Sequence, residues 1–364
     1  MNIVYIGKYN GIIGGIERYM QNSAELLRRN SFRVHYLYTE NGGRDQQKFA
    51  KAFDTIAELS PENELLQTAD LVVIHNIIPP EFLKKLPSGK TFFFAHDHNI
   101  YCQRHHYYTP FGRTNCHRKY QKLRCKLCSL FRNAAPPLED YRKLPALVLS
   151  DFMAENLRKN GFEKVVKLPA FVRTSGVERK FMPDGNLRIL FLGQLIRGKG
   201  ADLMLDTLGY MDLLEVPFQC TIAGDGKDRA MLEKTVKDAA LDYRVHFTGF
   251  VSDTESLWEN CDILFFPSRW QEPFGLVGLE AMAHGVPVIA FDTGGVREWL
   301  ADSENGIIVP EKATVAAGDK LAEICLGCPE RLAAMGKKGM EMAKEKFSEE
   351  NFVNRFRNLA EGLK

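Results

Sequence analysis

The chain of 364 residues lacks any long apolar run; no stretch reaches about eighteen apolar residues, which excludes an ordinary membrane-spanning helix. Its 29 glycines and 16 prolines are too few for a fibrous or disordered chain. Met1 to Gly7 contains no basic region and continues into a strand-like run, so we expect no signal peptide. We expect the eight cysteines to be free thiols or metal ligands and not a disulfide framework, as in a cytoplasmic protein.

Negative charge is also missing from one segment, because no Asp or Glu occurs between Asn99 and Pro137. The net charge is only +2, yet the first 180 residues carry 28 Lys and Arg against 17 Asp and Glu, and the rest carry 20 against 29. A basic half of this kind indicates an anionic partner, such as phosphates, a membrane surface or nucleic acid.

Short apolar runs alternate with helical stretches in two series. The first predicts strands at residues 3–7, 34–38, 71–75, 91–95 and 146–150, and a helix at 151–159. An irregular stretch, 174–186, is the expected linker. The second series predicts strands at 189–192, 220–223, 245–248, 262–267 and 286–291, and helices after Gly200, at 228–239, 252–259, 275–284 and 296–300, and from Lys312 onward. This alternation predicts two Rossmann-like, doubly wound α/β domains facing a cleft, with ligands beyond the carboxyl ends of the strands.

The segment from Glu272 to Glu280 carries the most specific chemistry. Gly275 allows a ligand to approach the backbone, and the first-turn N–H groups of the following helix are suited to phosphate or sugar hydroxyls. Glu272 precedes this helix and Glu280 lies inside it, so the two carboxylates can reach different parts of one ligand. A helix cap and a surface ion pair are the structural alternatives for the two glutamates.

This stretch resembles the retaining glycosyltransferases of family four, whose signature is two glutamates separated by seven residues. Residues 281–289 and Gly294-Gly295 continue the pattern. Further matching segments are 193–200, 222–226, 247–251, Gly14 to Glu17 and His96-Asp97, in the order that the family shows.

The resemblance implies the two-domain GT-B fold and a metal-independent, retaining transfer of a hexosyl-type sugar. The donor would be a nucleotide sugar, with UDP favoured over GDP, and the acceptor a lipid-linked glycan or polysaccharide of the cell surface, such as lipopolysaccharide. Residues 1–175 would form the acceptor-side domain and 187–345 the donor-binding domain, while 346–364 would form a helix that packs back towards the first domain.

The resemblance also assigns roles to single residues. Glu280 would hold the ribose hydroxyls and Glu272 the donor sugar, Lys199 would neutralise the leaving diphosphate, and His96 would reach the donor sugar near the reacting carbon. The catalytic set is thus His96, Glu272 and Lys199. The other expected donor-binding positions are Gly14, Gly15, Gln194, Val251, Phe274, Gly275, Leu276 and Val277. Gln194 departs from the family, which commonly has Arg there, and Arg197 could supply the missing charge.

Residues 101–133 form a basic insertion with four cysteines, of a kind found in a minority of the family. Cys125 and Cys128 have knuckle spacing, and Cys102 and Cys116 could complete a tetrahedral structural zinc site. Reduced thiols in a flexible loop are the alternative, and an iron–sulfur cluster is a further one. Basic and aromatic residues alternate in this segment, which predicts docking on anionic lipid headgroups or a lipid-linked diphosphate, against a merely solvated face.

Three functions therefore remain open from the sequence. The leading hypothesis is a glycosyltransferase that acts on a lipid-linked or polysaccharide acceptor, peripheral on the cytosolic membrane face. A GT-B enzyme with a small soluble acceptor is the second. A nucleic-acid-binding protein that uses the basic insertion is the third; the acidic second half and the glutamate motif argue against it, so no nucleic acid partner is expected.

Overall fold

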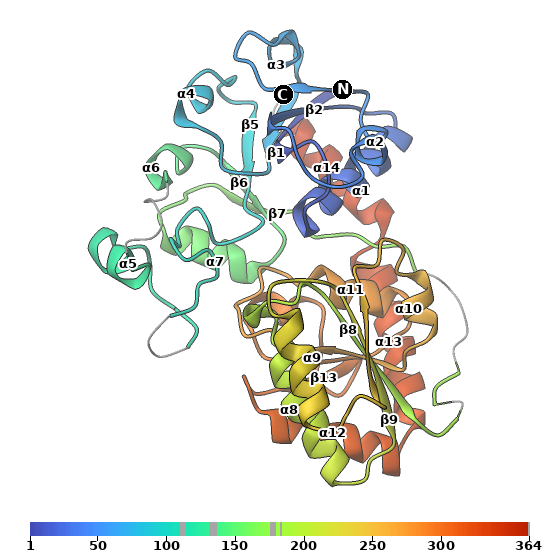
Figure 1. The fold of residues 1–364 in the computed structure, drawn as a ribbon. Helices are drawn as coiled ribbons and strands as arrows, with labels where there is room; N and C mark the ends of the chain where they lie inside the picture. The colour runs from blue at the N-terminus through green and yellow to red at the C-terminus, as the bar shows by residue number, and fades with distance from the viewer. Residues whose placement is uncertain (110–113, 131–136, 175–179, 183, 363–364) are drawn as a thin grey trace. The chain divides into compact units, whose positions relative to one another are not determined.

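The computed structural model describes residues 1–109, 114–130, 137–174, 180–182 and 184–362. The chain forms two compact units (Figure 1). The first unit comprises Met1–Ala170 and Glu349–Lys364, and the second comprises Phe171–Ser348.

The first unit is built on a seven-stranded sheet of order β3-β2-β1-β4-β5-β6-β7, in which every neighbouring pair is parallel. Its strands are β1 (Asn2–Tyr9), β2 (Arg33–Glu40), β3 (Thr55–Glu58), β4 (Leu71–Ile74), β5 (Thr91–Phe94), β6 (Ala146–Val148) and β7 (Val165–Lys167). The central strands β4, β5 and β6 are buried along their whole length, which explains their unbroken apolar sequences. The strand order reverses direction between β1 and β4, which is the switch point at which such sheets bind ligands.

The helices of the first unit are α1 (Gly15–Arg29), α2 (Gln46–Ala50), α3 (Glu64–Thr68), α4 (Pro80–Leu83), α5 (Lys122–Cys128), α6 (Leu138–Tyr141), α7 (Asp151–Lys159) and α14 (Glu349–Glu361). The C-terminal helix α14 packs on α1, with the Tyr19 and Phe352 ring centroids 6.5 Å apart. Arg29 adds an ion pair of 3.1 Å to Glu349. The first unit is therefore completed by the last residues of the chain.

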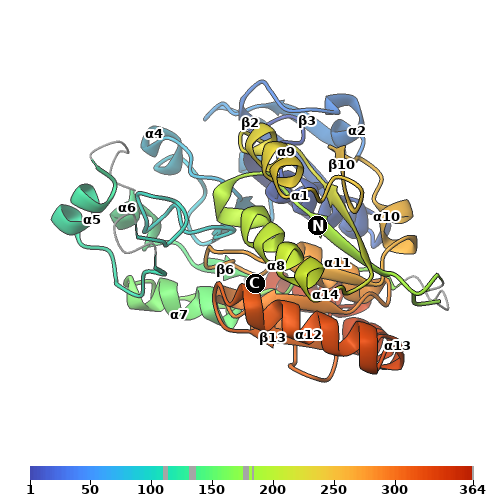
Figure 2. The same cartoon turned by 60° about the horizontal axis from the view of Figure 1, so that its bottom comes forward.

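The second unit holds a six-stranded parallel sheet of order β10-β9-β8-β11-β12-β13, the doubly wound order with its switch point between β8 and β11. Its strands are β8 (Leu187–Leu192), β9 (Phe218–Ala223), β10 (Val245–Gly249), β11 (Ile263–Phe266), β12 (Val288–Phe291) and β13 (Gly306–Val309). Helix α8 lies beside α12, and α11 lies beside α13 (Figure 2). The helical elements are η1 (Arg197–Lys199), α8 (Ala201–Leu213), α9 (Arg229–Asp238), α10 (Glu255–Glu259), α11 (Leu276–Ala283), η2 (Gly294–Glu298), α12 (Thr314–Gly327) and α13 (Glu330–Lys346).

The expected class of fold, two parallel α/β domains, is confirmed, but three details differ. Residues 296–300 were expected to be an α-helix, whereas the chain forms the 3₁₀ turn η2 two residues earlier. The turn begins at Gly294, whose φ is +60° and whose missing side chain allows the backbone of Glu272 to approach. The helical tail is interrupted near Pro329 and Ser348, and the short strands β3, β7 and β13 were not predicted. Part of the expected linker, residues 175–179 and 183, lies outside the described residues.

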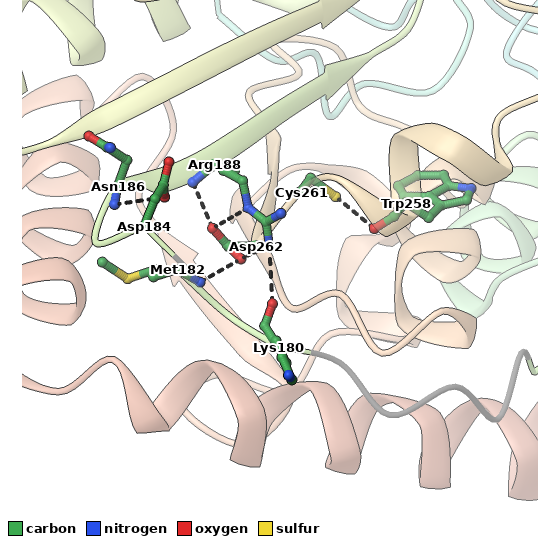
Figure 3. A network of polar contacts seen from close by, with 8 residues as sticks. All are labelled: Lys180, Met182, Asp184, Asn186, Arg188, Trp258, Cys261 and Asp262. Carbon is green, nitrogen blue, oxygen red and sulfur yellow. Dashed lines mark hydrogen bonds and ion pairs between the residues drawn. The ribbon is translucent and has the colours of Figure 1, made fainter.

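A buried ion pair fastens the beginning of the second sheet (Figure 3). The Asp262 side chain, before β11, is 0% exposed and lies 2.7 Å from the guanidinium of Arg188 in β8. The same carboxylate accepts hydrogen bonds from the backbone N–H groups of Arg188, at 2.8 Å, and Met182, at 3.0 Å. One side chain thus joins two neighbouring strands to the segment that enters the unit.

Replacement of this carboxylate tests its contribution. We expect Asp262→Ala to lower the free energy of unfolding by about 3 kcal/mol, because it leaves the guanidinium and two N–H groups without their acceptor. The matched control is Asp292→Ala, which removes an ion pair whose Arg297 and Asp292 side chains are 63% and 40% exposed. That change should cost less than about 1 kcal/mol. Urea unfolding measures both, and equal losses would contradict the prediction.

Candidate functional site

The loop after β8 brings a lysine to the switch point of the second unit. Lys199 ends η1, and Gly200 follows with a φ of +76°. A Cβ atom at Gly200 would lie 1.8 Å from the carbonyl oxygen of Pro267, so only glycine permits this close approach of the two loops. The approach carries the Lys199 Nζ atom to 2.7 Å from Oε1 of Glu272.

Glu272 lies on the loop after the neighbouring strand β11, and its carboxylate is held from several sides. The residue is 6% exposed, and the Ser268 hydroxyl donates a hydrogen bond of 2.6 Å to the same Oε1 atom that Lys199 contacts. The backbone carbonyl of Glu272 accepts from the N–H of Gly295 at 2.7 Å. The carboxylate is therefore positioned before any ligand arrives, and its second oxygen, Oε2, is not engaged by these two donors.

The positive end of α11 completes this edge of the sheet. Gly275 is the N-cap, with a φ of +94°, and the indole N–H of Trp299 donates a hydrogen bond of 2.6 Å to the carbonyl of the buried Phe274. The N–H groups of Leu276 and Val277 have no backbone acceptor within the described residues. Free N–H groups at a helix N-terminus, together with a lysine, form a site suited to an anionic group such as phosphate.

The other predicted residues of the second unit lie in or near the loops at this edge of the sheet, and the contacts described for them do not include Lys199 or Glu272. Glu280 is half-buried in α11, and its backbone carbonyl lies 2.8 Å from Nδ1 of His284, which stacks on Trp258. Gln194 is exposed, and Val251, in the loop after β10, is half-buried.

In the first unit, the loop after β1 leads into α1 through Gly14 and Gly15. The N–H of Gly14 donates a hydrogen bond of 2.9 Å to the buried carboxylate of Glu17, the third residue of the helix. This hydrogen bond fixes the glycine loop at the N-terminus of a fifteen-residue helix. The loop therefore adjoins the switch point between β1 and β4.

Two histidines meet at the same edge of the first sheet. His75 directly follows β4 and His96 follows the neighbouring strand β5, and Nδ1 of His75 lies 2.8 Å from Nε2 of His96. The rings of Phe94 and His96 stack with centroids 4.2 Å apart, and Tyr19 contacts His96 edge-on. Burial lowers the pKa of His96 to about 3 and holds that of His75 well below its usual value, so both rings are neutral at pH 7.

The environment of His75 bears on which nitrogen of His96 carries a proton. Nε2 of His75 is buried and has no hydrogen-bond partner within the described residues. A buried N–H group without an acceptor is rarer than a bare acceptor, which favours the proton of His75 on Nδ1, donated to His96. His96, a half-buried residue, then carries its own proton on Nδ1.

The pKa of Asp97, the residue after His96, is also displaced from its usual value. Burial raises the pKa of Asp97 to about 6, although the backbone N–H of Asn99 donates to it at 2.9 Å. The two residues of this motif thus have pKa values displaced in opposite directions by burial.

The described cysteines of the insertion are Cys102, Cys116, Cys125 and Cys128, which are half-buried and form no disulfide. Within the described residues, no group of three or more His, Cys, Asp or Glu side chains is arranged to hold a metal ion. Burial raises the pKa values of Cys102 and Cys128, so these two are protonated at neutral pH. The zinc site stays a prediction.

The chain is similar in sequence to known glycosyltransferases. Residues 176–342 match the family model "Glycosyl transferases group 1", and this match lies within the second unit. An uncharacterized glycosyltransferase of Methanocaldococcus jannaschii is 31% identical over 209 residues, which are 56% of this chain and 57% of that protein. The chain thus matches little more than half the length of this relative.

Solved structures match the whole chain. Anabaena HepE in complex with UDP aligns over 100% of both chains, with a TM-score of 0.74 and 16% identity. The lipopolysaccharide outer core galactosyltransferase WaaB aligns over 100% of this chain and 99% of its own, with a TM-score of 0.71 and 18% identity. The fold is therefore that of GT-B glycosyltransferases. None of the described helices combines the length and the apolar composition that a membrane span requires.

Several contributors to these sites were not predicted from the sequence. His75 ends a predicted strand, so its position at the sheet edge could have been found from the rule that parallel strands end together. Ser268 and Trp299 act through contacts between distant segments, and no local pattern marks them.

The burial of His96 predicts a pH dependence of stability. Its pKa is about 3 in the folded chain and near its usual value of about 6.5 in the unfolded chain. Below pH 6.5 only the unfolded state binds this proton, so stability is lost as the pH falls towards 3. We expect His96→Phe to reduce the loss between pH 6.5 and pH 5 by about 2 kcal/mol in urea unfolding. His246→Phe, at an exposed position of β10, is the control. A slope unchanged in His96→Phe would contradict the prediction.

Proposed function

We propose that the protein is a glycosyltransferase that transfers a sugar from a UDP-sugar to a glycan or lipid-linked acceptor, with retention of anomeric configuration. The observation that carries the proposal is the contact of Lys199 with Glu272 beside the N-terminus of α11, at the switch point of a glycosyl transferases group 1 domain. The complexes of HepE with UDP and with UDP-glucose support UDP over GDP.

The proposed roles follow from charge and geometry. As the bond from the anomeric carbon to the diphosphate breaks, negative charge grows on the diphosphate, and Lys199 and the N–H groups of Leu276 and Val277 would stabilise it. Glu272 would accept hydrogen bonds from the donor sugar, and Glu280 from the ribose hydroxyls. The acceptor oxygen would form the new bond on the face that the diphosphate leaves, passing its proton to a diphosphate oxygen. No step in this scheme requires a metal ion.

The first unit would bind the acceptor. His96, with a proton on Nδ1, would donate a hydrogen bond to a donor-sugar hydroxyl near the reacting carbon. Likeness to the lipopolysaccharide galactosyltransferase WaaB and the basic charge of the first 180 residues support a large, anionic or lipid-linked acceptor over a small soluble one. We propose that the enzyme works in the cytoplasm at the membrane surface.

Nucleotide binding tests the donor class. We expect UDP, but not GDP, ADP or CMP, to raise the midpoint of thermal unfolding, and EDTA to leave this shift unchanged. Ligand at a hundredfold excess over Kd adds about 2.7 kcal/mol of stability. A shift with GDP alone would correct the base, loss of the UDP shift in EDTA would contradict metal independence, and no shift with any nucleotide would refute the proposal.

Removal of the lysine tests the site itself. We expect Lys199→Ala to lower kcat for UDP-sugar turnover by about 10²- to 10³-fold, as when a preorganised electrostatic group at a leaving group is lost. Lys337→Ala, at an exposed position of α13, is the matched control and should retain full turnover. Comparable turnover in wild type and Lys199→Ala would place the diphosphate elsewhere.

A further inference from the structure

The short helix α5 in the basic insertion has no buried residue. Three leucines on and just after it, Leu123, Leu127 and Leu130, are 71%, 51% and 44% exposed. Leu123 and Leu127 are four residues apart, so they lie on the same side of the helix. Figures 1 and 2 both show α5 at the outer edge of the first unit, away from its sheet. Exposed leucines at adjacent turns form an apolar patch that water disfavours.

The other side of the insertion is tied firmly to the first unit. Tyr107 is 2% exposed, and its hydroxyl donates a hydrogen bond of 2.6 Å to the carbonyl of Arg118. The N–H of Tyr120 donates to the side-chain oxygen of Asn160 at 2.7 Å, and Lys159 donates to the carbonyl of His117. The leucines are therefore exposed although the segment that carries them is anchored.

Cations surround the leucines. Arg118, Lys119, Lys122 and Arg124 are exposed, and none of them forms an ion pair with a carboxylate in the described part of the chain. No acidic residue occurs between Asn99 and Pro137, so no carboxylate within the segment offsets this charge. Arg113 and Arg132, which belong to the same predicted insertion, lie outside the described residues.

We propose that α5 and its flanks dock the enzyme on an anionic lipid bilayer, with Leu123 and Leu127 inserted among the acyl chains and Lys122 and Arg124 at the headgroups. This surface would serve the membrane-associated function proposed above. The inference rests on that proposed function for the role of docking, and on the exposed leucines and cations for the place of docking. Leucines flanked by cations match a bilayer surface, where apolar groups lie beneath a layer of negative charge.

Other partners fit this surface less well. A single-stranded nucleic acid is bound mainly by aromatic rings that stack on bases, and aliphatic leucines offer no such stacking. A soluble phosphate group would engage the cations but would leave the leucines in water. Only an interface that accepts charge and aliphatic groups side by side uses both features.

Vesicle co-sedimentation tests the proposal with the full-length protein. We expect binding to vesicles of phosphatidylcholine and phosphatidylglycerol, and weaker binding, by about 30-fold or more, to phosphatidylcholine alone, which does not attract the cations. Lys122→Gln with Arg124→Gln should weaken binding about 30-fold, at roughly 1 kcal/mol for each cation. Leu123→Ser with Leu127→Ser should weaken it about tenfold or more through lost apolar insertion.

Matched pairs from the second unit serve as controls. Leu213 and Leu326 are 83% and 64% exposed, and their paired change to Ser should leave vesicle binding unchanged. Lys337→Gln with Lys338→Gln should do the same for charge. The thermal shift with UDP, measured on every variant, reports folding and donor binding separately, so failure to bind vesicles is distinct from failure of the transferase proposal.

Three results would overturn the proposal. The first is equal binding to neutral and anionic vesicles, and the second is wild-type binding by both α5 variants. The third is a loss of binding in the charge variant only, with pyrophosphate competing at constant ionic strength, which would identify a site for soluble phosphate instead of a bilayer surface.

Discussion

Parallel pairing of β8 with β11 is the constraint on which the donor-side geometry depends. Because both strands run the same way, the loops that follow them leave the sheet at one edge, although Lys199 and Glu272 are 73 positions apart in the chain. The close approach of Gly200 to Pro267 then sets the distance between the two loops. The ion pair therefore depends on the parallel pairing of the two strands and on the absence of a side chain at Gly200.

In the first unit, too, segments that follow neighbouring parallel strands meet at one edge of the sheet, but the groups that they carry are different. Its switch point gathers a glycine loop at a helix N-terminus and two neutral histidines, where the second unit gathers a cation and a carboxylate. Burial keeps the two histidines uncharged, so these rings offer hydrogen bonds without charge. The switch points of the two units therefore present different kinds of group to a ligand.

Much of the fold could be predicted because the alternation of short apolar runs with helical stretches is typical of parallel sheets covered by helices. The central strands were predicted because they are apolar and buried along their whole length, whereas β3 and β7, at the edges of the first sheet, are only partly buried and have too few apolar residues to stand out. The family motifs predicted Lys199, Glu272 and His96, each of which lies in the segment that follows a strand. His75 could have been found because it ends a predicted strand. Ser268 and Trp299 could not, because their contacts depend on how segments far apart in the chain come together. The spacing of the four cysteines in the insertion predicts a zinc site, and this site stays a prediction.

The discontinuity of the first unit has a consequence for how the chain matures on the ribosome. Helix α14, which covers α1, is synthesised after the whole second unit, whereas β1 is synthesised before it. Until the whole second unit has been translated, the surface of α1 that receives Phe352 has no covering partner. The first unit therefore reaches its final packing only after the second unit has been translated. A nascent chain of this protein would depend on protection of that apolar surface for longer than a chain whose domains end in sequence order.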